Sequence, residues 1–218
     1  MRENMTMTRR AMLGGALAAG AAATLGAGGL AFAEAKPESD APADAIAPQQ
    51  AGQYGFWIDT RQCVGCGNCV EACVKYNETP ADMEPRRTVV TYETQRGMRA
   101  HVSTACMHCA EPACAQVCPA GAIEKRADGI VDVHKDRCMG CKYCYQACPF
   151  QVPHYAPSGM DKCDCCLGNG VAPGDTPHCV QACNKNALHY GPIGELQARA
   201  GEAAELLRAP TKPSCLIS

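Results

Sequence analysis

The chain has 218 residues and 18 cysteines, but only 3 Phe and 1 Trp, so aromatic side chains cannot build a large core. Its formal net charge of −2 and its lack of a basic patch exclude a typical nucleic-acid-binding protein. So many cysteines in a chain of this size point to a disulfide framework or to bound metal.

Residues 1–33 have the pattern of an export signal. A short basic segment ends in Arg9 and Arg10, and an uncharged, Ala/Gly-rich run follows it up to Ala33. This pattern predicts a twin-arginine signal peptide, cleaved after Ala33, and a protein exported folded to the periplasm or to the outer face of the cytoplasmic membrane. The alternative is a retained membrane anchor, because an uncharged run of this length suffices to span a bilayer.

Residues 34–52 are rich in Pro, Ala and acidic residues, and we expect them to form a flexible linker. Tyr54–Thr60 is then predicted to be a β-strand. Val70–Asn77 is expected to be a short helix, because a three-residue gap places Cys69 and Cys73 on one helical face.

Two hairpins are predicted further along the chain. Thr88–Thr94 and Arg99–Thr104 form the first, an insertion that would cover a site or meet a partner. The second joins Ala122–Arg126 to Ile130–Val133 through an Asp-Gly turn.

A short strand and a helical tail are expected after these hairpins. The strand is Leu188–Tyr190, and Ile193–Leu207 is a polar, helix-prone tail.

Sixteen of the cysteines fall into four copies of one spacing, C-x2-C-x2-C-x3-C, with the middle gap widened in two copies. Glycines in the short gaps (Gly65, Gly67 and Gly140) allow backbone angles that would strain other residues. The four motifs are Cys63, Cys66, Cys69 and Cys73; Cys106, Cys109, Cys114 and Cys118; Cys138, Cys141, Cys144 and Cys148; and Cys163, Cys166, Cys179 and Cys183.

This spacing is typical of bacterial 4Fe-4S proteins, in which three close thiolates bind one cluster and the fourth reaches a second cluster. Zinc sites usually pair two C-x2-C units across a longer spacer. Disulfide frameworks do not usually repeat one short-gapped quartet four times. Both remain as structural alternatives to an electron-transfer protein.

Several residues near the motifs need separate interpretation. Cys165 lies inside the fourth motif and is interpreted as a bystander thiol, while the match of the C-terminal Cys215 segment to a prenylation box is interpreted as accidental. His108 is interpreted as a surface histidine, with a role in shielding a cluster as the alternative. Four basic residues beside ligands are expected either to raise cluster potentials or to form surface salt bridges: Lys75, Lys142, Lys162 and Arg137.

From Gln53 to about Leu207 the sequence resembles the iron-sulfur subunit of DMSO reductase-type molybdopterin oxidoreductases. The resemblance is carried by YGFWID before the first motif, the C-x2-C-x4-C-x3-C-P of the second, ACPF, DKCDCC and ALHYGPIGEL. It implies an α+β fold of two ferredoxin-like modules, each binding two 4Fe-4S clusters, with a β-hairpin insertion. Residues 53–193 would form this four-cluster domain, and residues 194–218 a C-terminal helix and tail.

The resemblance also implies that the first motif pairs with the fourth, and the second with the third. With the fourth cysteine crossing between paired motifs, the expected ligand sets are Cys63, Cys66, Cys69 and Cys183; Cys73, Cys163, Cys166 and Cys179; Cys106, Cys109, Cys114 and Cys148; and Cys118, Cys138, Cys141 and Cys144.

The implied function is a non-catalytic relay of single electrons between a quinol-oxidising membrane subunit and a molybdopterin catalytic subunit. We expect no nucleic-acid partner and no small-molecule substrate, since no nucleophile elbow, phosphate loop or dinucleotide fingerprint occurs. The alternatives are a subunit of a formate dehydrogenase, hydrogenase or nitrite/tetrathionate reductase system, or a free periplasmic polyferredoxin shuttle.

Overall fold

The computed structural model describes residues 52–93, 97–157 and 159–218. The expected signal peptide and nearly all of the linker, as well as the turn residues 94–96 of the first hairpin, lie outside these residues. None of the described helices is long and apolar enough to cross a membrane.

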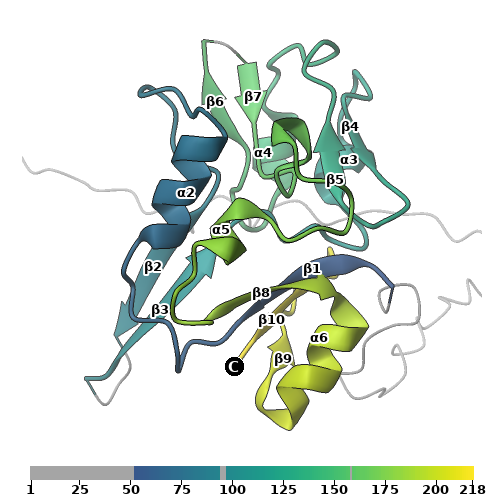
Figure 1. The fold of residues 1–218 in the computed structure, drawn as a ribbon. Coiled ribbons are helices and arrows are strands. Elements are labelled where there is room, and N and C mark those ends of the chain that lie inside the picture. Colours follow the sequence, from purple (N-terminus) through teal and green to yellow (C-terminus); the bar gives the residue numbers. More distant parts are fainter. Residues whose placement is uncertain (1–51, 94–96, 158) are drawn as a thin grey trace, which may run out of the picture. The chain divides into compact units, whose positions relative to one another are not determined.

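A four-stranded sheet forms one end of the described chain, in the order β8-β1-β10-β9 (Figure 1). Strand β1 (Tyr54–Ile58) pairs antiparallel with β8 (Leu188–Pro192) and parallel with β10 (Cys215–Ile217). Strand β9 (Glu205–Leu206) completes the sheet, antiparallel to β10. The predicted strands at Tyr54–Thr60 and Leu188–Tyr190 are therefore present as neighbours.

The C-terminal segment differs from the expected helical tail. Helix α6 (Ile193–Ala200) ends well before Leu207, a short 3-10 turn (Gly201–Ala203) follows it, and the remaining residues supply β9 and β10. Gly201, with φ of 66°, follows the last residue of the helix, and the backbone of β10 pairs with β1. The C-terminal residues thus form part of the sheet that supports the first cysteine motif.

Side chains of β1 and β10 alternate between two cores, as the period of two in a strand requires. Phe56, Ile58 and Cys215 face a core that contains most of the buried cysteines. Trp57 and Leu216 face the opposite side, where α6 packs on the sheet. Sulfur thus takes the place of aromatic rings in the larger core.

Gly55 allows β1 to lie against the segment before β10. A Cβ at this position would come within 2.2 Å of the Ser214 carbonyl oxygen, which accepts a hydrogen bond from the Phe56 amide at 3.1 Å. The glycine of YGFWID is therefore needed for this close approach.

Three hairpins surround the motifs: β2 (Thr88–Glu93) with β3 (Arg99–Thr104), β4 (Ile123–Lys125) with β5 (Val131–Val133), and β6 (His154–Ala156) with β7 (Gly159–Asp161). The first two were predicted and the third was not. Val89 and Val102 of the first hairpin pack on the main core, although they belong to opposite faces of the ladder, whereas Val90 and Tyr92 are exposed.

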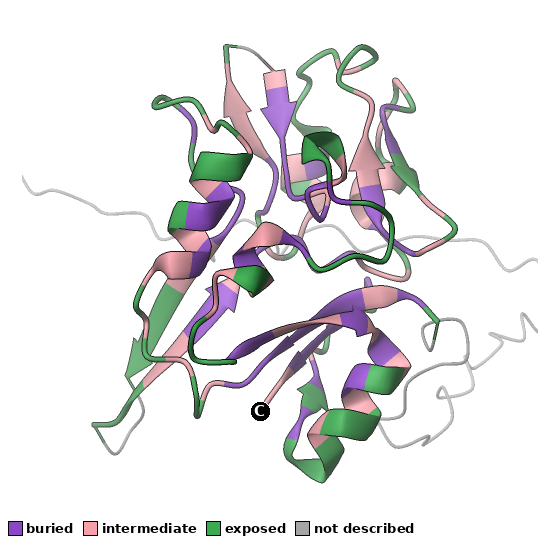
Figure 2. Cartoon of the chain, viewed as in Figure 1, coloured by how far each residue is buried: buried purple, intermediate pink, exposed green. Residues whose placement is uncertain are grey.

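Short helices follow or contain the cysteine motifs: α2 (Asn68–Tyr76), α3 (Ala113–Gln116), α4 (Tyr143–Ala147), a 3-10 turn (Leu167–Asn169) and α5 (His178–Gln181). Helix α2 packs against α5, and α3 packs against α4. Buried residues gather where these helices meet the hairpins and the sheet (Figure 2).

We expect Leu216→Ala to lower the free energy of unfolding by about 2–5 kcal/mol, because Leu216 is fully buried between the sheet and α6. Urea unfolding of anaerobically prepared protein, followed by circular dichroism, measures the change. Leu207→Ala, at a half-buried position of the same segment, should cost clearly less. Equal losses would mean that β10 is not a central strand.

Candidate metal centres

Each motif begins as a turn and continues into a short helix. In the first motif Gly65 and Gly67 have φ values of 69° and 84°, and in the third Gly140 has 72°. These values confirm that the gaps need a left-handed backbone. Helix α2 then places Cys69 and Cys73, four residues apart, on its buried face.

The first group of thiols combines two motifs that are distant in the sequence. Cys63, Cys66 and Cys69 line one cavity together with Cys183 of the fourth motif. Burial raises the pKa of Cys63, and the nearby thiols of Cys69, Cys183 and Cys66 raise it further. Cys73 is absent from this cavity, although it lies one helical turn from Cys69.

A second group surrounds Cys73. Burial raises the pKa of Cys73 to about 12, and the thiols of Cys163, Cys179 and Cys166 contribute to the rise. These three belong to the fourth motif. The first and fourth motifs therefore exchange their fourth cysteines: Cys183 lies with the first motif and Cys73 with the fourth. Bringing such thiols together without a cation is unfavourable once they ionise, and a bound metal removes this penalty.

The α3–α4 pair shows the same exchange. Burial raises the pKa of Cys114 to about 11, and the thiols of Cys148 and Cys109 contribute to the rise. The thiol of Cys106 is also close to that of Cys114. A separate cavity is lined by four further cysteines: Cys118, Cys138, Cys141 and Cys144.

Hydrogen-bonding groups from outside the motifs reach a sulfur in every group. Donors of this kind stabilise negative charge on sulfur and tune bound metal centres. Four contacts bring a group that can donate to sulfur: Ser103 Oγ to Cys69 at 3.2 Å, Asn77 Nδ2 to Cys73 at 3.7 Å, the Ala122 amide to Cys118 at 3.3 Å and Tyr155 Oη to Cys144 at 2.8 Å. In the third group the Cys109 thiol donates to Thr211 Oγ1 at 3.3 Å.

Arg87 is a buried cation between the first two thiol groups. Its side chain is only 1% exposed, and its Cζ lies 4.6 Å from the centre of the Phe56 ring. Nη1 donates to the carbonyl and the hydroxyl of Ser103, each at 3.1 Å. Because a guanidinium only donates, Ser103 Oγ accepts from Arg87 and keeps its own hydrogen for Cys69.

The surroundings of the other two Arg87 nitrogens indicate whether the thiol groups suit an anionic cofactor. Nε and Nη2 have no hydrogen-bond partner among the described residues. Burial opposes the charge, but the thiols of Cys179, Cys163 and Cys69 outweigh it and raise the pKa of Arg87. An uncompensated buried cation is costly, so the surroundings of Arg87 fit thiolates that hold a negatively charged cluster.

Arg86, the adjacent residue, has a different environment. It is also buried, but it pairs with Asp161 at 2.5 Å and with Asp164 at 2.8 Å. Its charge is therefore balanced by carboxylates, and it ties the first hairpin to the start of the fourth motif.

Of the four basic residues predicted beside ligands, only Lys162 is buried among thiols. Burial lowers the pKa of Lys162, but the thiols of Cys106 and Cys163 reverse this effect, and the pKa is raised. Lys75 and Lys142 are exposed and lie over the rings of Tyr76 and Tyr155. Arg137 is exposed as well.

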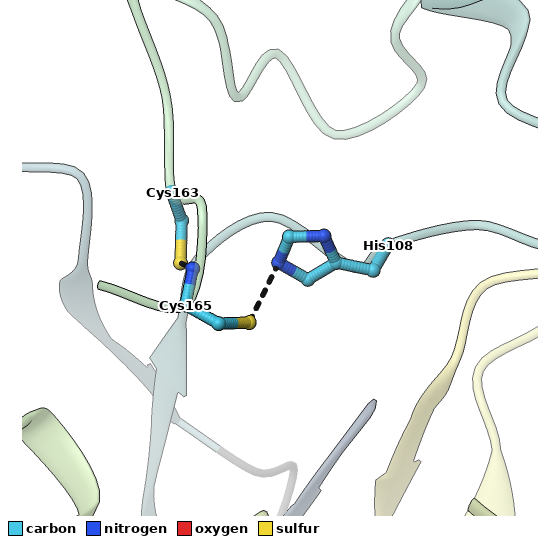
Figure 3. Close-up of side chains that lie close together, drawn as sticks. All are labelled: His108, Cys163 and Cys165. Carbon is cyan, nitrogen blue, oxygen red and sulfur yellow. Dashed lines mark hydrogen bonds between the residues drawn. The ribbon is translucent and has the colours of Figure 1, made fainter. Parts of the chain in front are cut away.

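His108 corrects the sequence interpretation, because it is not a surface residue but completely buried. Its Nε2 lies 3.2 Å from the sulfur of Cys165, and Cys163 is beside them (Figure 3). Composition suggested an exposed cysteine-rich loop, whereas packing of the fourth motif on the second excludes water here. Cys215 is also buried, within the sheet.

Comparisons with known proteins agree with this geometry. Residues 98–193 match a family described as 4Fe-4S dicluster domain, and residues 62–122 match a second family of the same description. The protein is 40% identical over 184 residues to the B subunit of the anaerobic dimethyl sulfoxide reductase of Escherichia coli strain K12, covering 76% of this chain and 88% of the relative. The protein belongs to the iron-sulfur subunits of DMSO reductase-type molybdopterin oxidoreductases.

Other members of this wider group are also similar. The formate dehydrogenase iron-sulfur subunit of Wolinella succinogenes is 37% identical over 62% of this chain and 80% of the relative. Protein NrfC of Escherichia coli strain K12 is 37% identical over 72% of this chain and 71% of the relative. The protein is therefore an electron-transfer iron-sulfur subunit that binds 4Fe-4S clusters.

Sequence reasoning about this iron-sulfur subunit missed the groups that contact sulfur from outside the motifs. Ser103, Asn77, Thr211 and Tyr155 are ordinary polar residues whose role depends on long-range packing. Nothing in the sequence distinguishes Arg87 from its neighbour Arg86.

We expect Arg87→Gln to shift the reduction equilibria of the neighbouring clusters at least about tenfold toward the oxidised form, or about 59 mV for a one-electron couple. The reason is the loss of a buried positive charge beside the ligand sulfurs. Redox titration monitored by electron paramagnetic resonance measures each potential. Arg99→Gln, the same change at an exposed position, is the control; equal shifts in both variants would contradict a local role for Arg87.

Proposed function

We propose that the sixteen motif cysteines of this subunit hold four 4Fe-4S clusters, one in each of the four thiol groups. The observation that carries the proposal is the grouping itself: each set takes three sulfurs from one motif and one from its partner motif. The sets are Cys63, Cys66, Cys69 and Cys183; Cys73, Cys163, Cys166 and Cys179; Cys106, Cys109, Cys114 and Cys148; and Cys118, Cys138, Cys141 and Cys144.

These four sets follow one another as a line. The first and second share helix α2 through Cys69 and Cys73. The second and third meet where Cys163 acts on the pKa of Cys106. The third and fourth are joined by α3, which contains Cys114 of the third set and ends two residues before Cys118 of the fourth. This order suits a protein that carries electrons from one end to the other.

The ends of the line reach the surface, whereas its middle is enclosed. Cys66 in the first set and Cys141 in the fourth are exposed, but Cys106, Cys163 and Cys179 are buried. Exposed apolar side chains lie beside both ends: Val64 near the first set, and Met139 and Tyr143 near the fourth. Apolar surface of this kind is typical of contact sites for other proteins.

A bound 4Fe-4S cluster takes up and returns one electron. The protein's own residues place the thiolates, exclude water from the inner sets and donate hydrogen bonds to the sulfurs. In this proposal the protein has no catalytic residue or substrate of its own, and works as a non-catalytic relay.

The partners that we propose are a molybdopterin catalytic subunit at one end and a quinol-oxidising membrane subunit at the other. Support comes from the higher identity to the B subunit of dimethyl sulfoxide reductase than to the formate dehydrogenase and NrfC relatives, over a larger share of the relative. The signal pattern of residues 1–33 supports a location outside the cytoplasmic membrane.

Four clusters predict about sixteen iron atoms and about sixteen acid-labile sulfides per chain. Metal and sulfide analysis of the full chain, purified anaerobically, measures both, and redox titration should show several interacting S = 1/2 signals on reduction. Zinc in place of iron, or oxidised thiols without metal, would contradict the proposal and favour a structural role for the cysteines.

The exchange of the fourth cysteines is tested separately by three single variants. Cys73→Ala and Cys163→Ala should remove the same resonance signal, since both residues belong to the second set. Cys69→Ala should remove a different signal, although Cys69 and Cys73 share a helix. Loss of one common signal from the Cys69 and Cys73 variants would show that each motif holds its own cluster.

A further inference from the structure

Tyr155 of the third hairpin reaches the fourth thiol group from outside the motifs. It lies on β6, paired with Met160 of β7, and both residues line the cavity of that group. The Oη atom of Tyr155 is 2.8 Å from the sulfur of Cys144, which is buried. The hairpin therefore brings a hydroxyl group to the third cysteine of the third motif.

The first motif has the same arrangement. Its third cysteine, Cys69, has the hydroxyl of Ser103 at 3.2 Å, and Ser103 also lies on a hairpin strand, β3. The first and third motifs share one spacing, and each contains an exposed cysteine, Cys66 or Cys141. A hydroxyl on the third cysteine thus recurs in the thiol groups at the two ends of the line.

The direction of the Tyr155 hydrogen bond follows from the proposed ligand set. A cysteine that binds a 4Fe-4S cluster does so as a thiolate, which has no hydrogen to donate. Cys144 therefore accepts, and the O–H of the phenol donates. Hydrogen bonds to ligand sulfurs stabilise the charge of the added electron, so they favour the reduced cluster.

Two residues of the third motif hold the ring of Tyr155. The ring of Tyr145 in α4 meets it edge-on, with 6.5 Å between the ring centres. Nζ of Lys142 lies 5.5 Å from the centre of the Tyr155 ring, within the range of a cation–π interaction. A positive charge over the ring withdraws electron density from the phenol. Lys142 therefore makes the hydroxyl a stronger donor to Cys144.

Lys142 has a backbone conformation that favours glycine. Its φ is 65°, and the residue at the same place in the first motif is Gly67, with φ of 84°. A residue with a side chain is strained at such an angle, and strain of this kind often marks a functional position. Lys142 also lines the cavity of the fourth thiol group. The strained position thus places a cation beside this group.

We propose that Tyr155 is a positioning residue whose hydroxyl, under the charge of Lys142, donates a hydrogen bond to the Cys144 sulfur and raises the reduction potential of the fourth cluster. The inference rests on the ligand sets proposed above. It assigns part of the control of the potential to a hairpin that contains no cysteine.

Tyr155→Phe provides the test, because phenylalanine keeps the ring and its packing but lacks the hydroxyl. The full chain, prepared anaerobically, should keep its iron and sulfide. The reduction equilibrium of one cluster should shift about tenfold toward the oxidised form, which lowers its potential by about 59 mV. Cys141→Ala identifies this cluster, because Cys141 belongs to the fourth set and its variant should lose the same resonance signal.

Two further variants separate the hydrogen bond from other effects. Tyr145→Phe removes a hydroxyl from the neighbouring ring and should leave the potential unchanged. Lys142→Gly introduces the residue of the first motif and relieves the backbone strain. It should lower the same potential by less than Tyr155→Phe does, and by less still at high salt, because Lys142 is exposed.

A second readout detects the hydrogen of the bond itself. After exchange into deuterium oxide, electron-nuclear double resonance of the reduced fourth cluster should show a strongly coupled exchangeable hydrogen that Tyr155→Phe lacks. A role in packing alone would leave this signal unchanged in the variant.

Several outcomes would overturn the proposal. An unchanged potential in Tyr155→Phe would remove its basis, and an equal shift in Tyr145→Phe would reduce it to an effect of ring packing. Loss of about four iron atoms from Tyr155→Phe would make the hydroxyl a structural requirement of the site. An unchanged potential in Lys142→Gly would remove the part assigned to Lys142. Absence of iron from the native chain would instead refute the proposed function.

Discussion

The burial of sulfur is the constraint on which the rest of this structure depends. Thiols in a low-dielectric core resist ionisation, and thiolates placed together repel one another, as the raised pKa of Cys73 shows. The protein meets this cost with positive charge and donors inside the core, above all Arg87 and Lys162. The few aromatic residues then serve as packing around sulfur.

Exchange of the fourth cysteine explains why the short helices pack in pairs. Each motif sends its third cysteine to one thiol group and its fourth to another, so two motifs must dock before either group is complete. Local turns and global packing are therefore coupled. A motif that folded alone would leave one sulfur without its partners, which links assembly of the centres to formation of the tertiary structure.

Local features could be predicted from the sequence, and features that depend on long-range packing could not. The helix that contains Cys69 and Cys73, the left-handed glycines and two hairpins follow from spacing and turn chemistry, and the structure has them. The burial of His108, the charge at Arg87 and the strand at Cys215 depend on segments far apart in the sequence. The resemblance to a family identified the electron-transfer role, but neighbouring residues such as Arg86 and Arg87 differ only in their three-dimensional surroundings.

The parallel pairing of β1 with β10 has a consequence for synthesis. β1 leaves the ribosome early, whereas Cys215–Ile217, its neighbour on one side, is made only after all four motifs. Until then β1 exposes an unpaired hydrophobic edge, which is a template for aggregation. Closure of the sheet beside the first cysteine motif therefore waits until Cys215–Ile217 has been made.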